Sequence, residues 1–291
     1  MRVWLYLGIA VCLAGIGAVL HGTAPTSRDA KIVQSENPDD GKVIDGVFVS
    51  HYFNLSYRLP DGLTEGLAGP PPSQSGYYVL GTWTPKRDFA GTVLVVAQDM
   101  FFAPDASDDV KNVVAEFRQV MSAVDGMTID REPVPVSVAG HPGYRIDFSG
   151  VGLFRSTFVI EIRCHVVTFN LTSRDPESLA SLAGSLDSLG SARKNEVSDP
   201  VPECLKDYAS ENIVSRVEPE GVGAKAVSIP VRMIVATDGS VKHVHVIRAS
   251  AAQRRNIEEA VRQWKLKPYV KQGHPAEVET GVMFNLKPAN T

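Results

Sequence analysis

One stretch decides the fold of the C-terminal part: Val227-Ser-Ile-Pro-Val-Arg-Met-Ile-Val-Ala-Thr-Asp-Gly-Ser-Val-Lys-His-Val-His-Val246. Apolar residues alternate with other residues from Val227 to Val235, which is the period of a β-strand with one buried face. The pair Asp238-Gly239 then supplies a two-residue hairpin turn before a second alternating run. The stretch therefore predicts a β-hairpin.

The register of this hairpin follows from pairing Thr237 with Ser240. It places Val235 opposite Lys242, Met233 opposite Val244, and Val231 opposite Val246. The aliphatic residues then share one face. The other face carries Arg232, Ile234, His243 and His245, and we expect it to be solvated.

A helix and a third strand follow the hairpin. Ile257, Ala260, Val261 and Trp264 have the i, i+3, i+4, i+7 spacing of an amphipathic helix, which Pro268 should stop. Trp264 is its expected core anchor. Residues 277–286 alternate again and predict a final strand.

The final strand is the candidate partner-binding site. A helix between strands two and three lets them run parallel with strand one between them, so strand three becomes a sheet edge. An edge can accept a partner's extended segment by β-augmentation. The expected edge residues are Glu277, Val278, Glu279, Thr280, Gly281, Val282, Met283 and Phe284. Pro230 lacks a backbone donor and should weaken pairing near it.

Residues 43–192 predict an α+β sandwich. Strands are expected at Val47–Leu59, Tyr77–Trp83, Thr92–Gln98, Val134–Val138, Tyr144–Phe148, Phe154–Ile162 and His165–Leu171. One helix should begin after an N-cap at Ser107, and a second after Asp175-Pro176, ending at Gly190. Hairpin strands with two packed helices are typical of α+β domains.

The N-terminus predicts a membrane segment. Residues 1–20 contain an uncharged apolar run from Val3 to Leu20, long enough to cross a bilayer. An uncleaved inner-membrane anchor is favoured over a cleaved signal peptide, and either places the body in the periplasm. Residues 21–42 have the composition of a flexible tether, and residues 193–224 of a linker leading to the domain at 225–291.

Composition and motifs argue against several functions. The formal net charge of -4 is not that of a nucleic-acid-binding protein. The sequence has no Gly-x-Ser-x-Gly elbow, phosphate-binding Gly-rich loop or His-Glu-x-x-His helix, so we predict no enzyme, no catalytic residues and no cofactor. His243, His245 and His274 could approach a metal, but no acidic or cysteine ligand completes the set on that face, so no metal site is predicted.

Two cysteines follow the membrane segment, Cys164 and Cys204. In an oxidising compartment they could form a disulfide between the first domain and the start of the second. The alternative is two isolated, partly buried thiols, and the sequence leaves both open.

The C-terminal pattern resembles the TonB C-terminal domain family. The resemblance is carried by Ala260-Val-Arg-Gln-Trp-Lys-Leu-Lys-Pro268, Gly273-His-Pro275 and Val282-Met-Phe-Asn-Leu286, after the Asp-Gly hairpin. It covers residues 225–286 closely and 200–224 loosely, where Pro202-Glu-Cys204 replaces the family's usual Tyr-Pro. Residues 45–190, with Gly140-His-Pro-Gly-Tyr-Arg145 before paired strands, resemble the PsbP-like family more loosely.

The PsbP-like resemblance implies a fold only, whereas the TonB-like resemblance implies a function. TonB-like proteins are anchored in the inner membrane, bind outer-membrane TonB-dependent receptors through a sheet edge, and pass on energy from proton-driven motor proteins. We therefore expect a TonB-like periplasmic protein that binds a receptor strand. The alternative is a periplasmic binding or scaffolding protein without energy transduction.

Overall fold

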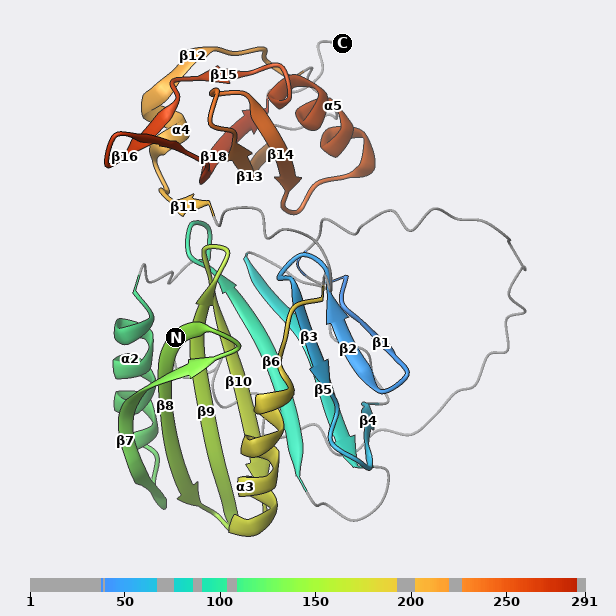
Figure 1. The fold of residues 1–291 in the computed structure, drawn as a ribbon, viewed down its shortest axis with the longest axis vertical. Helices are drawn as coiled ribbons and strands as arrows, with labels where there is room; N and C mark the ends of the chain where they lie inside the picture. The colour runs from blue at the N-terminus through green and yellow to red at the C-terminus, as the bar shows by residue number, and fades with distance from the viewer. Residues whose placement is uncertain are drawn as a thin grey trace, which may run out of the picture. The chain divides into compact units, whose positions relative to one another are not determined.

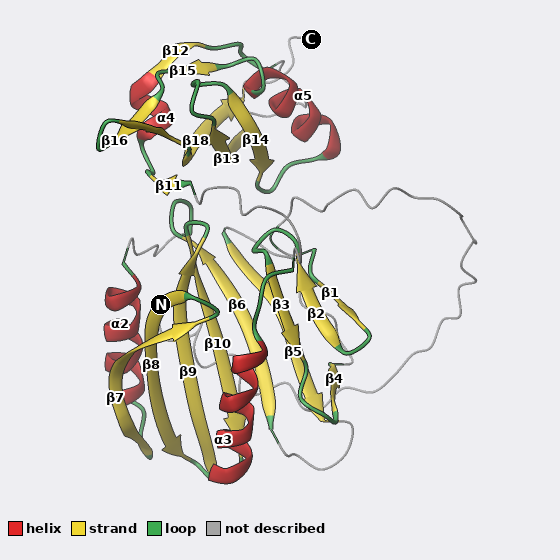
Figure 2. Ribbon diagram, in the orientation of Figure 1, coloured by secondary structure: helices red, strands yellow, loops and turns green. Residues whose placement is uncertain are grey.

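The computed structural model describes residues 38, 40–66, 76–85, 91–103, 109–192, 202–219 and 227–286. All of these lie within one compact unit, Glu36–Thr291. Two sheet-based domains can be followed in Figures 1 and 2: an N-terminal domain, residues 40–192, and a C-terminal domain, residues 202–286. The α+β class predicted from the sequence is confirmed.

Among the described residues, no helix combines the length and apolar character needed to span a bilayer. The membrane segment predicted at Val3–Leu20, and most of the tether at 21–42, lie outside the described residues.

The N-terminal domain is built on a seven-stranded antiparallel sheet and a smaller three-stranded sheet. Their orders are β4-β5-β6-β10-β9-β8-β7 and β1-β2-β3. The elements are β1 (Lys42–Ile44), β2 (Val47–Ser50), β3 (Leu55–Arg58), β4 (Leu63–Glu65), β5 (Tyr77–Pro85), β6 (Thr92–Asp99), α2 (Val110–Ser122), β7 (Met127–Val138), β8 (His141–Gly150), β9 (Leu153–Ile162), β10 (His165–Ser173), α3 (Pro176–Ser185) and the 3-10 helix η2 (Leu186–Ser188).

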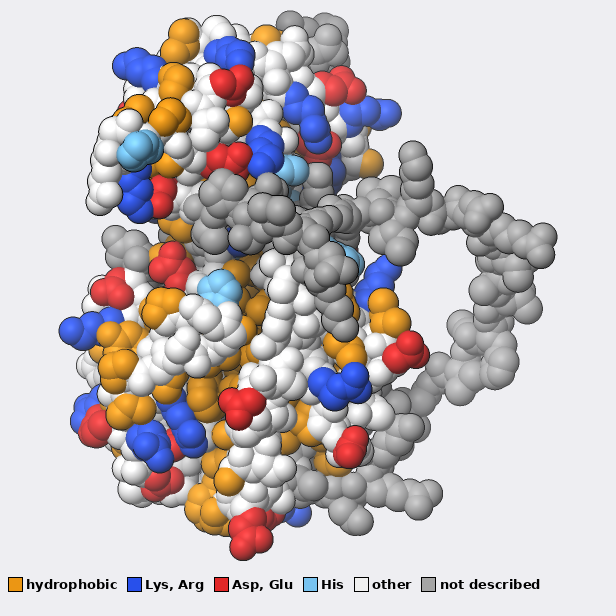
Figure 3. Space-filling model, viewed as in Figure 1, with side chains coloured by type: hydrophobic (Ala, Val, Ile, Leu, Met, Phe, Trp, Pro, Cys, Tyr) orange, Lys and Arg blue, Asp and Glu red, His pale blue; other side chains and the backbone are white. Residues whose placement is uncertain are grey.

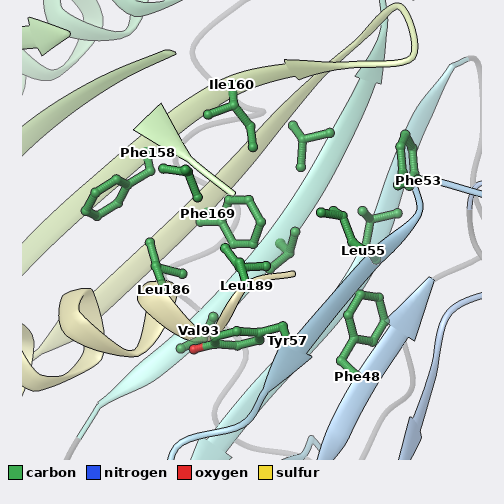
Figure 4. Packing of buried hydrophobic residues seen from close by; sticks show 14 of the residues in the cluster. Phe48, Phe53, Leu55, Tyr57, Val93, Phe158, Ile160, Phe169, Leu186 and Leu189 are labelled. Atoms are coloured by element: carbon green, nitrogen blue, oxygen red, sulfur yellow. The ribbon is translucent and has the colours of Figure 1, made fainter. Parts of the chain in front are cut away.

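The main core lies between the two sheets and α3. Figure 4 shows members of this core from the larger sheet (Phe158 and Phe169), from η2 (Leu186) and from the smaller sheet (Phe48 and Tyr57). Successive strand residues point to opposite faces of a sheet. The far face of β8 and β9 therefore packs against α2, through a second set of apolar residues that includes Val114, Met121, Ile146, Phe148 and Val159.

Several local predictions for this domain need correction. The single strand expected at 47–59 is a hairpin, because Asn54 adopts a positive φ of 50° in the turn between β2 and β3. Helix α2 is capped by Asp109, whose carboxylate accepts a hydrogen bond from Lys111 N at 2.8 Å, rather than by Ser107. Asp175 and Pro176 begin α3 as predicted, but α3 ends at Ser185 and η2 follows it.

The C-terminal domain has a four-stranded sheet in the order β11-β18-β13-β14, covered on one face by α5. Two short two-stranded ladders, β12-β15 and β16-β17, complete it. The elements are β11 (Glu203–Cys204), α4 (Tyr208–Asn212), β12 (Ile213–Ser215), β13 (Val227–Val235), β14 (Val241–Val246), α5 (Ala251–Val261), β15 (Lys265–Leu266), β16 (Tyr269–Lys271), β17 (His274–Ala276) and β18 (Val278–Leu286).

The hairpin register is confirmed at Val231–Val246 and Met233–Val244, while a bulge places Val235 opposite Val241 instead of Lys242. The turn uses both predicted residues. Asp238 Oδ1 accepts a hydrogen bond from Ser240 N at 2.8 Å, and Gly239 has a φ of 82°. A Cβ at Gly239 would lie 2.0 Å from Leu266 O, so glycine is required for the close approach as well as for the turn.

The helix prediction is right about its buried face and wrong about its end. Ile257, Ala260 and Val261 are buried, but α5 ends at Val261, well before Pro268. Trp264 follows the helix and is still a core residue: its side chain is buried and its Nε1 donates to Val217 O at 2.8 Å. Residues 265–266 then form β15, paired with β12, and this pairing replaces the last helical turn.

The weaker pairing expected near Pro230 is not found in the β13-β18 ladder, and the β13-β14 ladder ends at Val231–Val246, one residue before Pro230. Its carbonyl points to the β14 side, where it accepts a hydrogen bond from Ile247 N at 2.9 Å just beyond the end of β14. On the other side, the β13-β18 ladder continues without a break through Pro230–Met283. The missing N–H therefore falls where the β14 ladder has already ended.

Candidate functional site

The expected partner-binding strand, β18, is not a free edge along its whole length. Strand β11 runs parallel to its first half. Glu203 N donates to Glu277 O at 2.8 Å, Leu205 N donates to Glu279 O at 3.0 Å, and Gly281 N donates to Lys206 O at 3.3 Å. The three-stranded sheet predicted from the sequence is therefore a four-stranded sheet, because β11 pairs with the expected edge and residues 205–206 continue its hydrogen bonds.

The same hydrogen bonds define which groups of β18 face outward. Backbone groups of alternate residues point to the same side of a strand. Since those of Glu277, Glu279 and Gly281 point to β11, those of Met283 and Asn285 also point away from β13. Among the described residues, no backbone partner lies on the outer side of these last two, and the Met283 side chain is 52% exposed. The open edge of the described sheet is thus the second half of β18, residues 282–286.

The sheet face opposite α5 carries a buried group of charges. Arg232 on β13 lies between Asp99 at the end of β6 and Glu279 on β18, all at most 2% exposed. Arg232 Nη1 is 2.6 Å from Asp99 Oδ2, and Arg232 Nη2 is 3.0 Å from Glu279 Oε1. Its guanidinium also lies 4.4 Å from the centre of the Phe101 ring. We call Arg232, Asp99 and Glu279 the charge cluster.

The charge cluster joins the two domains. Asp99 is fixed by hydrogen bonds that its Oδ1 accepts from Phe101 N at 2.7 Å and Phe102 N at 3.0 Å. Arg232 Nη2 donates to Arg163 O at 3.1 Å. Burial lowers the pKa of Arg232, but the carboxylates of Glu279 and Asp99 outweigh burial and raise it, so the guanidinium stays charged.

Aromatic and imidazole rings surround the charge cluster. Tyr52 lies edge-on to His165 at 5.6 Å and within 6.0 Å of His245. Burial, and next the positive charge of Arg232, hold the pKa of His165 well below its usual value. The same two causes, in the same order, lower the pKa of His245 to about 3. Both imidazoles are therefore neutral in the folded protein near pH 7.

The face that carries Arg232, Ile234, His243 and His245 was expected to be solvated, and this expectation is wrong for most of it. Arg232 is 1% exposed and Ile234 is 7% exposed. His245 is largely enclosed, whereas His243 stays exposed. A Cβ added to Gly281 on the same face would lie 2.4 Å from Phe102, so the N-terminal domain covers this face closely.

Cys164 and Cys204 form a disulfide, with their Cα atoms 5.5 Å apart. Cys164 is fully buried in the turn between β9 and β10, where Arg163 and Cys164 both have positive φ. Cys204 belongs to β11. Of the two alternatives left open by the sequence, the structure therefore has the disulfide, and it attaches the added edge strand to the N-terminal domain.

Sequence reasoning missed Asp99, Arg163 and the role of Arg232 and Glu279. One signal for them is Ile234, an apolar residue on the same face as Arg232, which indicates burial on that face. Asp99 follows a regular strand and precedes two phenylalanines, but nothing local relates it to a residue more than a hundred positions away. Among the described residues, no group of three or more metal-ligating side chains comes together, and His274 lies exposed on β17.

The C-terminal domain is a small sheet covered on one face by a helix. A disulfide and the charge cluster link it to the N-terminal domain, which is an α+β sandwich. Comparison with known families adds a more specific assignment: residues 187–286 match the family described as Gram-negative bacterial TonB protein C-terminal. The C-terminal domain is therefore TonB-like, which confirms the resemblance seen in the sequence and indicates a cell-envelope protein.

Two solved structures illustrate distant likenesses. Cyanobacterial PsbP from Synechocystis sp. is 11% identical over 58% of this chain and 99% of its own, with a TM-score of 0.37. LpqN of Mycobacterium tuberculosis, described as involved in cell envelope biogenesis, is 15% identical over 47% of this chain and 82% of its own, with a TM-score of 0.33. No curated protein matches the chain.

Proposed function

We propose that the chain is a TonB-like periplasmic protein that binds a strand of an outer-membrane TonB-dependent receptor by β-augmentation. The observation that carries the proposal is the outward backbone of Met283 and Asn285 on a TonB-like sheet. A partner strand that pairs there obtains main-chain hydrogen bonds for affinity, while its alternate side chains contact the exposed Met283 side chain.

The surface charges support recognition through the backbone rather than through a charged patch. On the C-terminal domain, as seen in Figure 3, lysine and arginine side chains are interspersed with aspartate and glutamate side chains. A receptor strand without strong net charge can approach this face of the domain, because neither positive nor negative side chains dominate it.

Energy coupling is the second part of the proposal. A TonB-like domain on an inner-membrane anchor, predicted at Val3–Leu20, would pass force from proton-driven motor proteins to the receptor. The charge cluster and the disulfide support this role, because a pull on the N-terminal domain would be transmitted to the receptor-binding sheet through a covalent and an ionic connection.

The test measures binding of synthetic peptides from the N-terminal segments of outer-membrane TonB-dependent receptors to the full-length chain in mild detergent. The full chain is needed because Arg232 is buried against the N-terminal domain. Met283→Pro removes an outward N–H without removing a β13-β18 hydrogen bond, and we expect it to weaken binding by at least about tenfold.

Met283→Ala is the matched control, since it keeps the N–H and removes only the side chain. It should retain affinity to within about threefold, a loss of less than 1 kcal/mol. Equal losses in both variants would indicate recognition of the side chain instead of the backbone. Absence of binding by wild-type protein to every receptor peptide would favour the scaffolding role.

A further inference from the structure

We propose that β11 is a built-in substitute for the partner strand, and that the Cys164–Cys204 disulfide is a redox-sensitive clasp that holds it on the edge of β18. The inference rests on the proposed function, because it concerns the same sheet edge. In the oxidised protein, among the residues that the structure describes, the open part of this edge is residues 282–286. Reduction would extend the open edge back to Glu277.

Residues 203–206 form the backbone hydrogen bonds to Glu277, Glu279 and Gly281 that a bound strand would form. A strand that occupies these groups competes directly with a partner, because each outward N–H or carbonyl is satisfied once. The chain thus carries its own occupant for the first half of the site.

Strand β11 makes few side-chain contacts of its own, although just beyond it Thr280 Oγ1 donates to Lys206 O at 3.0 Å. It is two residues long, and neither Glu203 nor Cys204 is fully buried. Apart from the backbone bonds, Glu203 forms an ion pair with Lys271 at 2.6 Å, and both side chains are at least 33% exposed. Solvent-exposed pairs contribute little. The covalent bond to Cys164 is the strongest attachment of β11.

The disulfide joins β11 to the N-terminal domain at Cys164, close to the charge cluster. Cys164 is fully buried, and its neighbours Arg163 and His165 adjoin the charge cluster, with Arg163 Nε 3.8 Å from Glu279 Oε2. The ion pairs of the charge cluster join side chains of β13, β18 and the end of β6, and none of them involves a side chain of β11. Breaking the disulfide therefore releases β11 while Arg232, Asp99 and Glu279 keep β13 and β18 docked on the N-terminal domain.

The chemistry is thiol–disulfide exchange with a dithiol reductant. A thiolate of the reductant attacks Sγ of Cys204, the more accessible of the two, and the sulfur–sulfur bond breaks with Cys164 as the leaving thiolate, which then takes up a proton. The mixed disulfide joins the first sulfur of the reductant to Cys204 Sγ. The second thiol of the reductant attacks that first reductant sulfur and releases Cys204 as a thiol. The protein gains two electrons and two protons, and the reductant becomes a disulfide.

The first part of the test follows hydrogen exchange of single backbone amides in the full-length chain, with and without dithiothreitol. We expect the Gly281 amide, which donates to Lys206 O, to exchange at least about tenfold faster after reduction. The Met233 amide inside the β13-β18 ladder should be unchanged, which shows that the domain remains folded. Cys204→Ser and Cys164→Ser should reproduce the reduced behaviour and be insensitive to dithiothreitol.

The second part measures the affinity for receptor peptides in both redox states. We expect binding to tighten about tenfold on reduction, since more of the edge becomes available. Unchanged exchange at Gly281, or faster exchange at Gly281 with unchanged affinity, would overturn the clasp while leaving the proposed function in place. No peptide binding in either state would instead reject the proposed function and the clasp with it.

Discussion

One face of the β11-β18-β13-β14 sheet packs Val231, Met233 and Val246 against α5, whereas the opposite face presents Arg232 and Glu279 to Asp99 of the N-terminal domain. Both faces are buried. The first is stabilised by apolar area removed from water, which depends little on exact geometry. The second depends on charges that must meet with good geometry to offset the cost of leaving water.

Two buried faces of one sheet can therefore differ in how well they tolerate substitution. Loss of a methyl group from the apolar face leaves a small cavity. Loss of one charge from the other face leaves its partners buried without compensation, which costs more than the pair contributes. The charged face therefore fixes how the two domains meet and makes that arrangement sensitive to single changes.

The largest effect is expected for Arg232→Met. It leaves the carboxylates of Asp99 and Glu279 buried without a cation, and should lower the free energy of unfolding by roughly 3–5 kcal/mol in urea denaturation. The triple variant with Asp99→Asn and Glu279→Gln, which neutralises all three groups, should recover part of the loss. If the triple variant were less stable than Arg232→Met, the unpaired carboxylates would not be the cause of the stability loss in Arg232→Met.

A smaller effect is expected from pH. His245 has a folded pKa of about 3, below its unfolded value, and the pKa of His165 is also lowered. As the pH falls below about 6.5, the histidines bind protons more readily in the unfolded state than in the folded state, and protonation therefore favours unfolding. The free energy of unfolding is highest above that pH and decreases below it by up to roughly 1.4 kcal/mol per pH unit per histidine.

Urea denaturation at pH 7 and pH 5 would measure this loss. His245→Leu should reduce the difference between the two pH values, because one of the two titrating groups is gone. A difference unchanged by the substitution would show that His245 does not contribute.

On the apolar side, Trp264→Phe should cost about 1–2 kcal/mol. The smaller ring leaves a cavity beside Phe284, and Val217 O loses the hydrogen bond donated by Trp264 Nε1. Thermal unfolding would measure the change, with peptide binding at β18 as a second readout. A loss as large as that of Arg232→Met would remove the contrast between the two faces.

The smallest effect is expected for Lys271→Ala, which removes the exposed ion pair with Glu203. In the oxidised protein this variant should unfold at the same urea concentration as wild type, because exposed pairs are screened by solvent. A clear loss of stability would show that the ion pair, and not only the disulfide, fixes β11.

Much of the fold could be predicted because its signals are local. The Asp238-Gly239 turn, the alternation along β13 and β14, and the Asp175-Pro176 start of α3 each depend on residues close together in sequence. The TonB-like resemblance of residues 225–286, which lie within the matched family range 187–286, and the burial of Trp264 followed from such patterns. The extra edge strand did not, because two residues at 203–204 have no period from which a strand can be recognised.

The sequence by itself determined the hairpin of β13 and β14, the start of α3, strand β18 and the apolar face of the C-terminal sheet. Only the tertiary structure decided that Arg232 meets Asp99, that Cys164 meets Cys204, and that β11 covers half of β18. The physical reason is that periodicity reports which side of an element avoids water, while pairing between charges, thiols or strand edges depends on which distant residues the packed domains bring within a few ångströms.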